Sequence, residues 1–163
     1  MISADLNVIL PEILLALFAI LALLGAVYTN KDAAAGVIVW ATAIVMTLLA
    51  IWIGMTSGGT QRIAFNGLFV EDSFARFAKV TMLLSAAAVL AMSEAYMKKR
   101  GLLRFEYPVL IALSVVGMMM MVSAGDLMTL YMGLELQSLA LYVVASLRRD
   151  SVKSTEAGLK YFV

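Results

Sequence analysis

Residues Leu130–Arg149 read LYMGLELQSLALYVVASLRR and carry one acid, Glu135, before two arginines at the end of the stretch. A helix of about 20 apolar residues is long enough to cross the hydrocarbon core of a membrane. Basic residues directly after such a helix are typical of its cytoplasmic end. The stretch therefore predicts a membrane-spanning helix with a carboxylate near its middle. Because an acid at that depth costs free energy on every scale, it needs a partner, water or a function.

The composition places the whole chain in the same class. Of 163 residues, 63% are hydrophobic and 14% are charged, whereas soluble domains average about 45–50% and about 25%. A net charge of +1 provides no basic surface for nucleic acid. The chain has no cysteine and no histidine, which excludes disulfides, thiolate catalysis and histidine-ligated metals or haem. Its chemistry must depend on carboxylates, lysines, hydroxyls or the backbone.

The apolar blocks predict an all-α fold, a polytopic transmembrane helical bundle with five complete spans and the start of a sixth. The blocks cover residues 12–28, 33–54, 69–97, 107–124 and 127–147, and the sixth begins near residue 155. Asp5 or Asn7 is expected to cap the first helix, with Pro11 in its first turn. The Gly-rich segment 55–67 shows no helical pattern. Because the sixth helix is cut after about two turns, we expect the chain to continue into a longer protein.

Basic residues gather in the loops at one end of the predicted bundle. The loops on the side of the N-terminus hold Arg62. The loops on the opposite side hold Lys31, Lys98, Lys99, Arg100, Arg104, Arg148, Arg149 and Lys153. By the positive-inside rule, the N-terminus is predicted to lie outside, away from the cytoplasm or matrix.

Four charged residues open the third predicted helix: Glu71, Asp72, Arg76 and Lys79. The favoured interpretation is an ion cluster at the membrane interface, in which the long basic side chains reach back to water. The alternative is an entry funnel for ions on the outer side.

Glu135 shares one helical face with three hydroxyl side chains, Tyr131, Ser138 and Tyr142, at spacings of −4, +3 and +7. It lies about 12 Å below the edge of a hydrocarbon core about 30 Å thick. One interpretation is a protonated acid that packs against a neighbouring helix. The other, favoured because intramembrane acids are functional by default, is a site that carries a proton or another ion.

Lys160 is the lysine that the sequence places within a span, about 8 Å into the sixth helix from the basic side. Its depth differs from that of Glu135 by about 10 Å, so water would have to bridge the two side chains. We interpret Lys160 as an inner-side step of a proton path, with a snorkelling lysine at a helix end as the alternative. The immediate partner of Glu135 is expected beyond Val163.

The run GDLMTLYMGLELQSLALYVVASLRRDSVKSTEAGLKYF at Gly125–Phe162 resembles the fifth and sixth helices of the subunit N family of respiratory complex I, NADH:quinone oxidoreductase. LPEILLALFAILALL at 10–24 and DSFARFAKVTMLL at 72–84 resemble the same family. That family belongs to the antiporter-like membrane subunits. The resemblance implies two parts: residues 1–124 hold transmembrane helices 1–4, and residues 125–163 hold helix 5, an amphipathic connector and the start of helix 6, where the proton-channel repeat begins.

The resemblance further implies roles for two residues. Glu135 matches the glutamate of the fifth helix, which pairs with a lysine on a later helix, and Lys160 matches the lysine of the sixth helix that is assigned to the proton path. No cofactor is expected on this chain, because NADH, FMN, the iron–sulfur clusters and quinone are expected on other subunits. The small subunit K, the antiporter-like subunit M and the lipid bilayer are the expected neighbours.

Three functions therefore remain open. The first is proton translocation within a quinone-reducing NADH dehydrogenase, in which this chain itself carries out no redox step. The second is a subunit of a multisubunit Na+/H+ antiporter, and the third is a structural membrane scaffold with an inert buried acid. The expected location is the bacterial plasma membrane with the N-terminus in the periplasm, and the alternative is the mitochondrial inner membrane.

Overall fold

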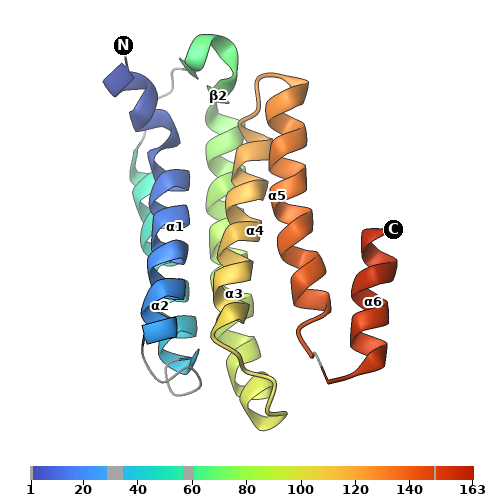
Figure 1. The fold of residues 1–163 in the computed structure, drawn as a ribbon. Helices are drawn as coiled ribbons and strands as arrows, with labels where there is room; N and C mark the ends of the chain where they lie inside the picture. Colours follow the sequence, from blue (N-terminus) through green and yellow to red (C-terminus); the bar gives the residue numbers. More distant parts are fainter. Residues whose placement is uncertain (1, 29–34, 57–60, 149) are drawn as a thin grey trace.

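The computed structural model describes residues 2–28, 35–56, 61–148 and 150–163 as a bundle of antiparallel helices (Figure 1). The helices are α1 Ile2–Tyr28, α2 Ala35–Met55, α3 Ser73–Lys99, α4 Glu106–Val122, α5 Leu127–Ala145 and α6 Val152–Phe162. Fully buried apolar side chains from α1 to α4, among them Leu15, Met46, Leu83 and Met119, form one hydrophobic cluster. The predicted all-α membrane bundle is confirmed.

Among the described residues, four helical segments are long and apolar enough to cross a membrane: Leu6–Tyr28, Ala35–Met55, Ser73–Lys99 and Leu127–Ala145. The prediction of five full spans differs from the structure at α4, which has 17 residues. At 1.5 Å per residue α4 is about 26 Å long, somewhat shorter than a typical hydrocarbon core of about 30 Å. It nevertheless runs alongside α3 and α5 and connects the two ends of the bundle (Figure 1).

Two expected helix starts are wrong. Helix α1 begins at Ile2 and has Pro11 inside it, so neither Asp5 nor Asn7 is the cap. Helix α3 begins at Ser73 rather than near residue 69. Its N-cap is Asp72, whose carboxylate accepts a hydrogen bond from the Ala75 amide at 2.7 Å. A capping acid satisfies a backbone N–H that has no partner within the helix.

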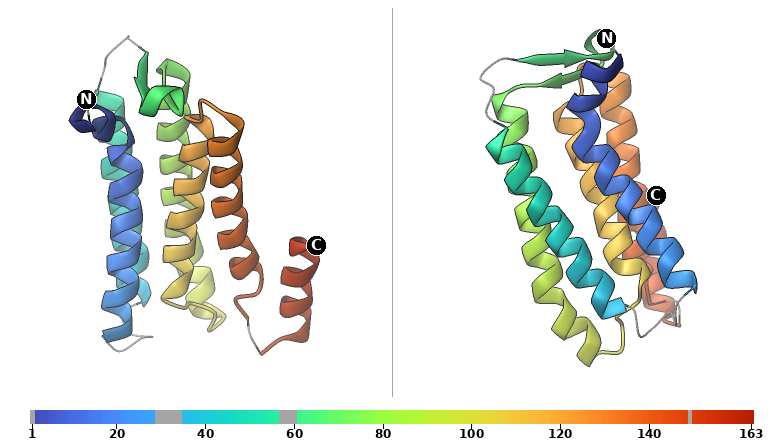
Figure 2. Two further views of the ribbon diagram at one scale, coloured as in Figure 1. Left: turned by 45° about the horizontal axis from the view of Figure 1, so that its top comes forward. Right: turned by 90° about the vertical axis from the view of Figure 1, so that its left-hand side faces the viewer.

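Residues before α3 form a small hairpin instead of helix. Strands β1 Arg62–Ala64 and β2 Phe69–Glu71 pair antiparallel around a 3₁₀ turn, η1 Phe65–Gly67. The hairpin lies across the same end of the bundle as the N-terminus (Figure 2). Its outer edge is also paired, because Val70 N–H donates to the Ser123 carbonyl at 2.8 Å and Gly125 N–H donates to the Leu68 carbonyl at 2.9 Å. The hairpin is thereby joined to the segment that leads into α5.

Asp126 caps the N-terminus of α5. Its carboxylate accepts a hydrogen bond from the Thr129 amide at 2.9 Å. Hydrogen bonds from the Thr129 side chain and backbone hold the pKa of the Asp126 carboxyl below its ordinary value of 3.8. The start of α5 is therefore held by this cap and, just before it in the sequence, by the hydrogen bonds to the hairpin.

Gly117 of α4 and Gly133 of α5 let these two helices meet backbone to backbone. A Cβ atom at Gly117 would lie 2.7 Å from the Gly133 carbonyl oxygen, and one at Gly133 would lie 2.9 Å from the Gly117 carbonyl oxygen. Small residues permit this close approach in membrane helices. The contact fixes the rotation of α5 about its own axis, and with it the direction in which Glu135 points.

Replacing Gly133 by alanine should therefore push α4 and α5 apart. We expect the full-length protein in detergent to lose about 1–3 kcal/mol of stability, the usual cost of overpacking, measured as a lower temperature of thermal unfolding. Gly25→Ala is the control, because nothing lies within 4 Å of a Cβ atom at Gly25. Equal unfolding temperatures for the two variants would show that the helices do not touch there.

Candidate functional site

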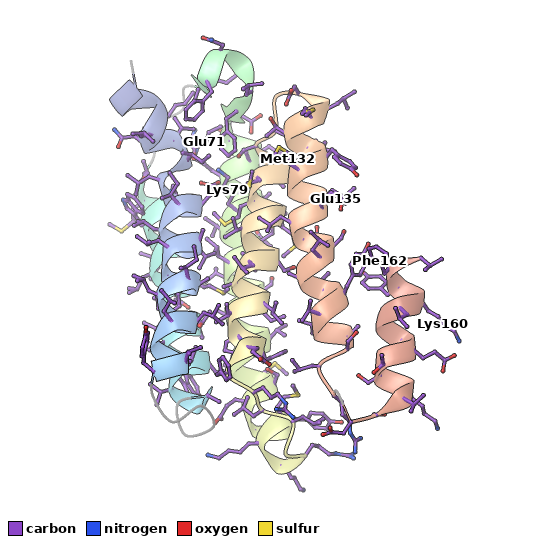
Figure 3. The ribbon with its side chains drawn as sticks, in the orientation of Figure 1. Glu71, Lys79, Met132, Glu135, Lys160 and Phe162 are labelled. Carbon is purple, nitrogen blue, oxygen red and sulfur yellow. The ribbon has the colours of Figure 1, made fainter. Side chains whose placement is uncertain are left out.

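Glu135 lies on α5 at the border between the face that packs on α4 and the face that is open. Gly133 and Ala140 are buried on the packed face, whereas Tyr131 and Met132 are each 58% exposed within this chain. The Glu135 side chain is half-buried and lies close enough to the Tyr131 hydroxyl, one turn earlier, for the two groups to interact electrostatically. Figure 3 shows Glu135 on the side of α5 away from α1 and α2.

The other hydroxyl residues of the predicted polar face have different surroundings. The Tyr142 ring meets the rings of Tyr161 and Phe162 edge-on, with centroid distances of 5.0 and 5.5 Å. Tyr142 thus holds α6 against α5. Ser138 is half-buried. Within the described part of the chain, the structure brings Tyr131 to Glu135 but shows no bond from Ser138 or Tyr142 to it, so a supporting role for these two stays a prediction.

Lys160 lies near the end of α6, with its side chain 76% exposed. Its Nζ forms an ion pair of 2.6 Å with Glu156, one turn earlier on the same helix. Helix α6 itself is held close to α5, since a Cβ atom at Gly158 would overlap the Ser146 hydroxyl. Among the described residues Lys160 does not contact Glu135, and a step between them remains a prediction.

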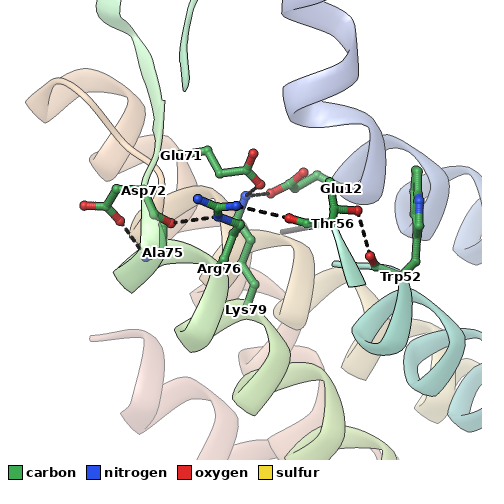
Figure 4. A network of polar contacts seen from close by, with 8 residues as sticks. All are labelled: Glu12, Trp52, Thr56, Glu71, Asp72, Ala75, Arg76 and Lys79. Atoms are coloured by element: carbon green, nitrogen blue, oxygen red, sulfur yellow. Dashed lines mark hydrogen bonds and ion pairs between the residues drawn. The ribbon is translucent and has the colours of Figure 1, made fainter. Parts of the chain in front are cut away.

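Three ionisable side chains are buried together near the hairpin end of the bundle (Figure 4). Lys79 Nζ lies 2.6 Å from Glu12 Oε1 and 3.9 Å from Glu71 Oε1. The exposed fractions are 0% for Lys79, 2% for Glu12 and 7% for Glu71. We call these residues the buried triad. They come from α3, α1 and β2, so the triad joins two helices to the hairpin.

The triad corrects the interpretation of Lys79 as a lysine that reaches back to water. Its Nζ instead points inward, 5.2 Å from the centre of the Phe69 ring, where an aromatic face attracts a cation. The other two charged residues of the predicted cluster do lie toward water. Asp72 caps α3, and Arg76 donates to the Thr56 carbonyl at 3.1 Å. The cluster thus has a buried part and an exposed part.

The pairing of Glu12 with Lys79 was missed by the sequence analysis, although a signal was present. Each residue lies six positions into its apolar segment, which start at Leu6 and Ser73. That corresponds to about 9 Å along each helix, so the acid and the base lie at similar depth. An intramembrane acid and an intramembrane base at one depth are candidate partners.

Comparison with known proteins adds a second line of evidence. A family model described as NADH:quinone oxidoreductase/Mrp antiporter, TM, matches residues 124–163. NADH-quinone oxidoreductase subunit N from Jannaschia sp. (strain CCS1) is 66% identical over all 163 residues, and that from Rhodobacter capsulatus is 64% identical over the same length. The chain resembles subunit N of NADH-quinone oxidoreductase.

The similarity to subunit N covers all of this chain and 34% of each of these two relatives. The subunit N of Rhodospirillum rubrum is 48% identical over 94% of this chain and 32% of its own length. The chain thus spans about a third of the length of the relatives it matches, and it corresponds to their N-terminal part.

A solved structure has the same fold. The respiratory complex I from Thermus thermophilus with bound aureothin contains a chain that superposes with a TM-score of 0.73, over 93% of this chain and 32% of that one, at 24% identity. At this identity the likeness shows the fold alone.

Removing the Lys79 ammonium should strongly destabilise this subunit N-like protein. Breaking a buried ion pair by deleting one partner costs about 3–5 kcal/mol, because the other charge is left buried alone. We expect Lys79→Met in the full-length protein to unfold at a clearly lower temperature or to fail to accumulate in membranes. Lys99→Met, on the same helix but exposed at its end, is the matched control. A Lys79→Met protein as stable as the control would refute the ion pair.

Proposed function

We propose that the protein to which this chain contributes translocates protons as a membrane subunit of NADH:quinone oxidoreductase, with Glu135 as an exchanging carboxyl group. The observation that supports this most is the place of Glu135. It is a half-buried carboxylate in the middle of a 19-residue apolar helix, next to the hydroxyl of Tyr131. An acid in such a segment is a functional-site hypothesis by default, and the resemblance to subunit N supplies the context.

The energetics of one carboxylate suffice for one transfer step. An ammonium that approaches a carboxylate favours its ionised form, and one that leaves favours the protonated form. A swing of about 3 pKa units corresponds to roughly 4 kcal/mol. Moving one proton against about 150–200 mV requires about 3.5–4.6 kcal/mol. A glutamate that gains and loses one lysine partner can therefore drive such a step.

In this proposal the open side of Glu135 faces a further part of the protein. The helix α5 buries few of its side chains within the chain, and the relatives are about three times as long. We place the lysine partner of Glu135 in that remaining part. Lys160 serves as an inner-side step, supported by its position on α6, which Tyr142 and Gly158 hold beside α5.

In this proposal the redox chemistry takes place elsewhere. NADH, FMN, iron–sulfur clusters and quinone bind to other subunits, and subunits K and M are the membrane neighbours. The distribution of basic residues and the sources of the similar proteins support a location in a bacterial plasma membrane. Arg100 and Arg104 lie with other basic residues at the end of the bundle opposite the hairpin, and the similar proteins named above are bacterial. We therefore place the protein in a bacterial plasma membrane with the hairpin on the periplasmic side.

The runner-up is a subunit of a Na+/H+ antiporter. The matching family model includes Mrp antiporters in its description, so the antiporter-like fold alone does not separate the two. The names of the relatives at 64–66% identity favour the oxidoreductase. Co-purification with flavin- and iron–sulfur-containing subunits separates the two functions directly, since an antiporter has no use for them.

Glu135→Gln in the intact complex removes the exchangeable proton but keeps the shape of the side chain. We expect NADH-driven proton uptake by proteoliposomes to fall by about tenfold, which corresponds to ~1.4 kcal/mol on the limiting barrier. Glu135→Asp should be milder, because it keeps the charge. Glu94→Gln, near the C-terminal end of α3, is the control, and this variant should pump normally. Normal pumping by Glu135→Gln would leave the scaffold interpretation standing.

A further inference from the structure

We propose that the buried triad of Glu12, Lys79 and Glu71 is a second proton-binding site, in which the two carboxyl groups share one exchangeable proton beside the ammonium. The site lies at the hairpin end, on other elements than Glu135. It does not depend on the proposed function, because it concerns the protonation state of the triad and not its use.

The charge of the triad motivates the proposal. Two carboxylates and one ammonium leave one negative charge in excess, on side chains that are 93% or more buried. An uncompensated charge in a low-dielectric interior is costly, and a buried acid responds by binding a proton. A carboxyl pair that shares a site cannot be fully ionised without such compensation.

The charges around the triad are more exposed and lie toward water. They are Arg62, the strand partner of Glu71 on β1, Asp72, the N-cap of α3, and Arg76 on α3. Arg62 and Arg76 are half-buried and Asp72 is exposed. Water and salt screen the charges that they can reach, so these less buried side chains compensate the charge of the triad less well than a proton bound on the carboxylate itself.

An unpartnered atom marks where a proton is needed. Glu12 Oε1 faces the ammonium, whereas Glu12 Oε2 is buried and has no hydrogen-bond partner among the described residues. A buried carboxylate oxygen without a donor keeps its full desolvation cost. Protonation of the pair relieves this cost, because it neutralises one carboxylate while the other keeps the ammonium.

The Lys79 ammonium is not placed equally between the two carboxyl groups. The ammonium lies 1.3 Å closer to Glu12 than to Glu71, at 2.6 against 3.9 Å. Since Coulomb attraction falls with distance, the ammonium in this position attracts the Glu12 carboxyl group more strongly than the Glu71 carboxyl group. A shift of the ammonium toward Glu71 reverses the preference. The proton and the ammonium are therefore coupled, and the titration belongs to the pair of acids and not to either one.

Exchange with water is expected through the hairpin end. Glu71 is the least buried member of the triad, and it lies on β2 directly before the exposed Asp72. Arg76 and the Thr56 carbonyl lie beside it (Figure 4). We therefore expect protons to reach the carboxyl pair from the water at the hairpin end of the bundle, through Glu71.

Infrared spectroscopy of the full-length protein in lipid tests the site. Protonated carboxyl groups absorb apart from carboxylates, and the band moves when D2O replaces H2O. We expect Glu12→Gln and Glu71→Gln each to lose one such exchangeable band, because each leaves a single carboxylate paired with Lys79. Glu94→Gln should keep it. Persistence of the band in both triad variants would overturn the proposal.

Two further measurements keep the test decisive if a triad variant does not assemble. The first uses the Glu135→Gln variant, which leaves the triad intact, so the exchangeable band of the triad must remain. Disappearance of the band would assign the exchangeable proton to Glu135 and overturn the proposal. Spectra in sodium and in potassium buffers must agree, because a band that sodium abolishes would identify a metal cation as the occupant. A negative infrared result for the triad would not change the proton pumping expected to depend on Glu135. The two proposals can therefore fail independently.

Discussion

Lys79 and Glu12 meet across two membrane helices with 2.6 Å between Nζ and Oε1, and much of the structure follows from the need to keep that contact. In hydrocarbon a charged side chain is not hydrated, so its burial costs free energy unless it has a partner. The ammonium therefore requires its acids, and the acids require it. Because Glu71 belongs to β2, the same requirement holds the hairpin over the end of the bundle.

The hairpin transmits this constraint to α5. Its strand β2 and the preceding Leu68 are hydrogen-bonded to residues on either side of Ala124, and a Cβ atom at Gly125 would overlap the Gly67 carbonyl oxygen. Two residues later α5 begins, with Gly133 seated on Gly117. The start of α5 and its rotation are thus both set by backbone contacts. Glu135, on that helix, is held in a fixed direction by parts of the chain that it does not touch.

The sequence predicted what depends on length and composition, and missed what depends on contacts between distant residues. Apolar blocks located the helices because a membrane span needs about 20 residues. The strands β1 and β2 have three residues each, too few to show a period of two. The pairing of Glu12 with Lys79 requires knowing that these two side chains, on α1 and α3, point toward each other. The ring contacts of Tyr142 depend on how α6 folds back, which no local pattern encodes.

The most direct test of the account is an exchange of the charges of Glu12 and Lys79. The measurement is the thermal unfolding temperature of the full-length protein carrying Glu12→Lys, Lys79→Glu or both. Each single change puts like charges together and should be strongly destabilising, while the double variant restores opposite charges and should recover much of the loss, a positive coupling between the sites. A double variant as unstable as the sum of the single ones would contradict the ion pair as the constraint that organises this end of the bundle.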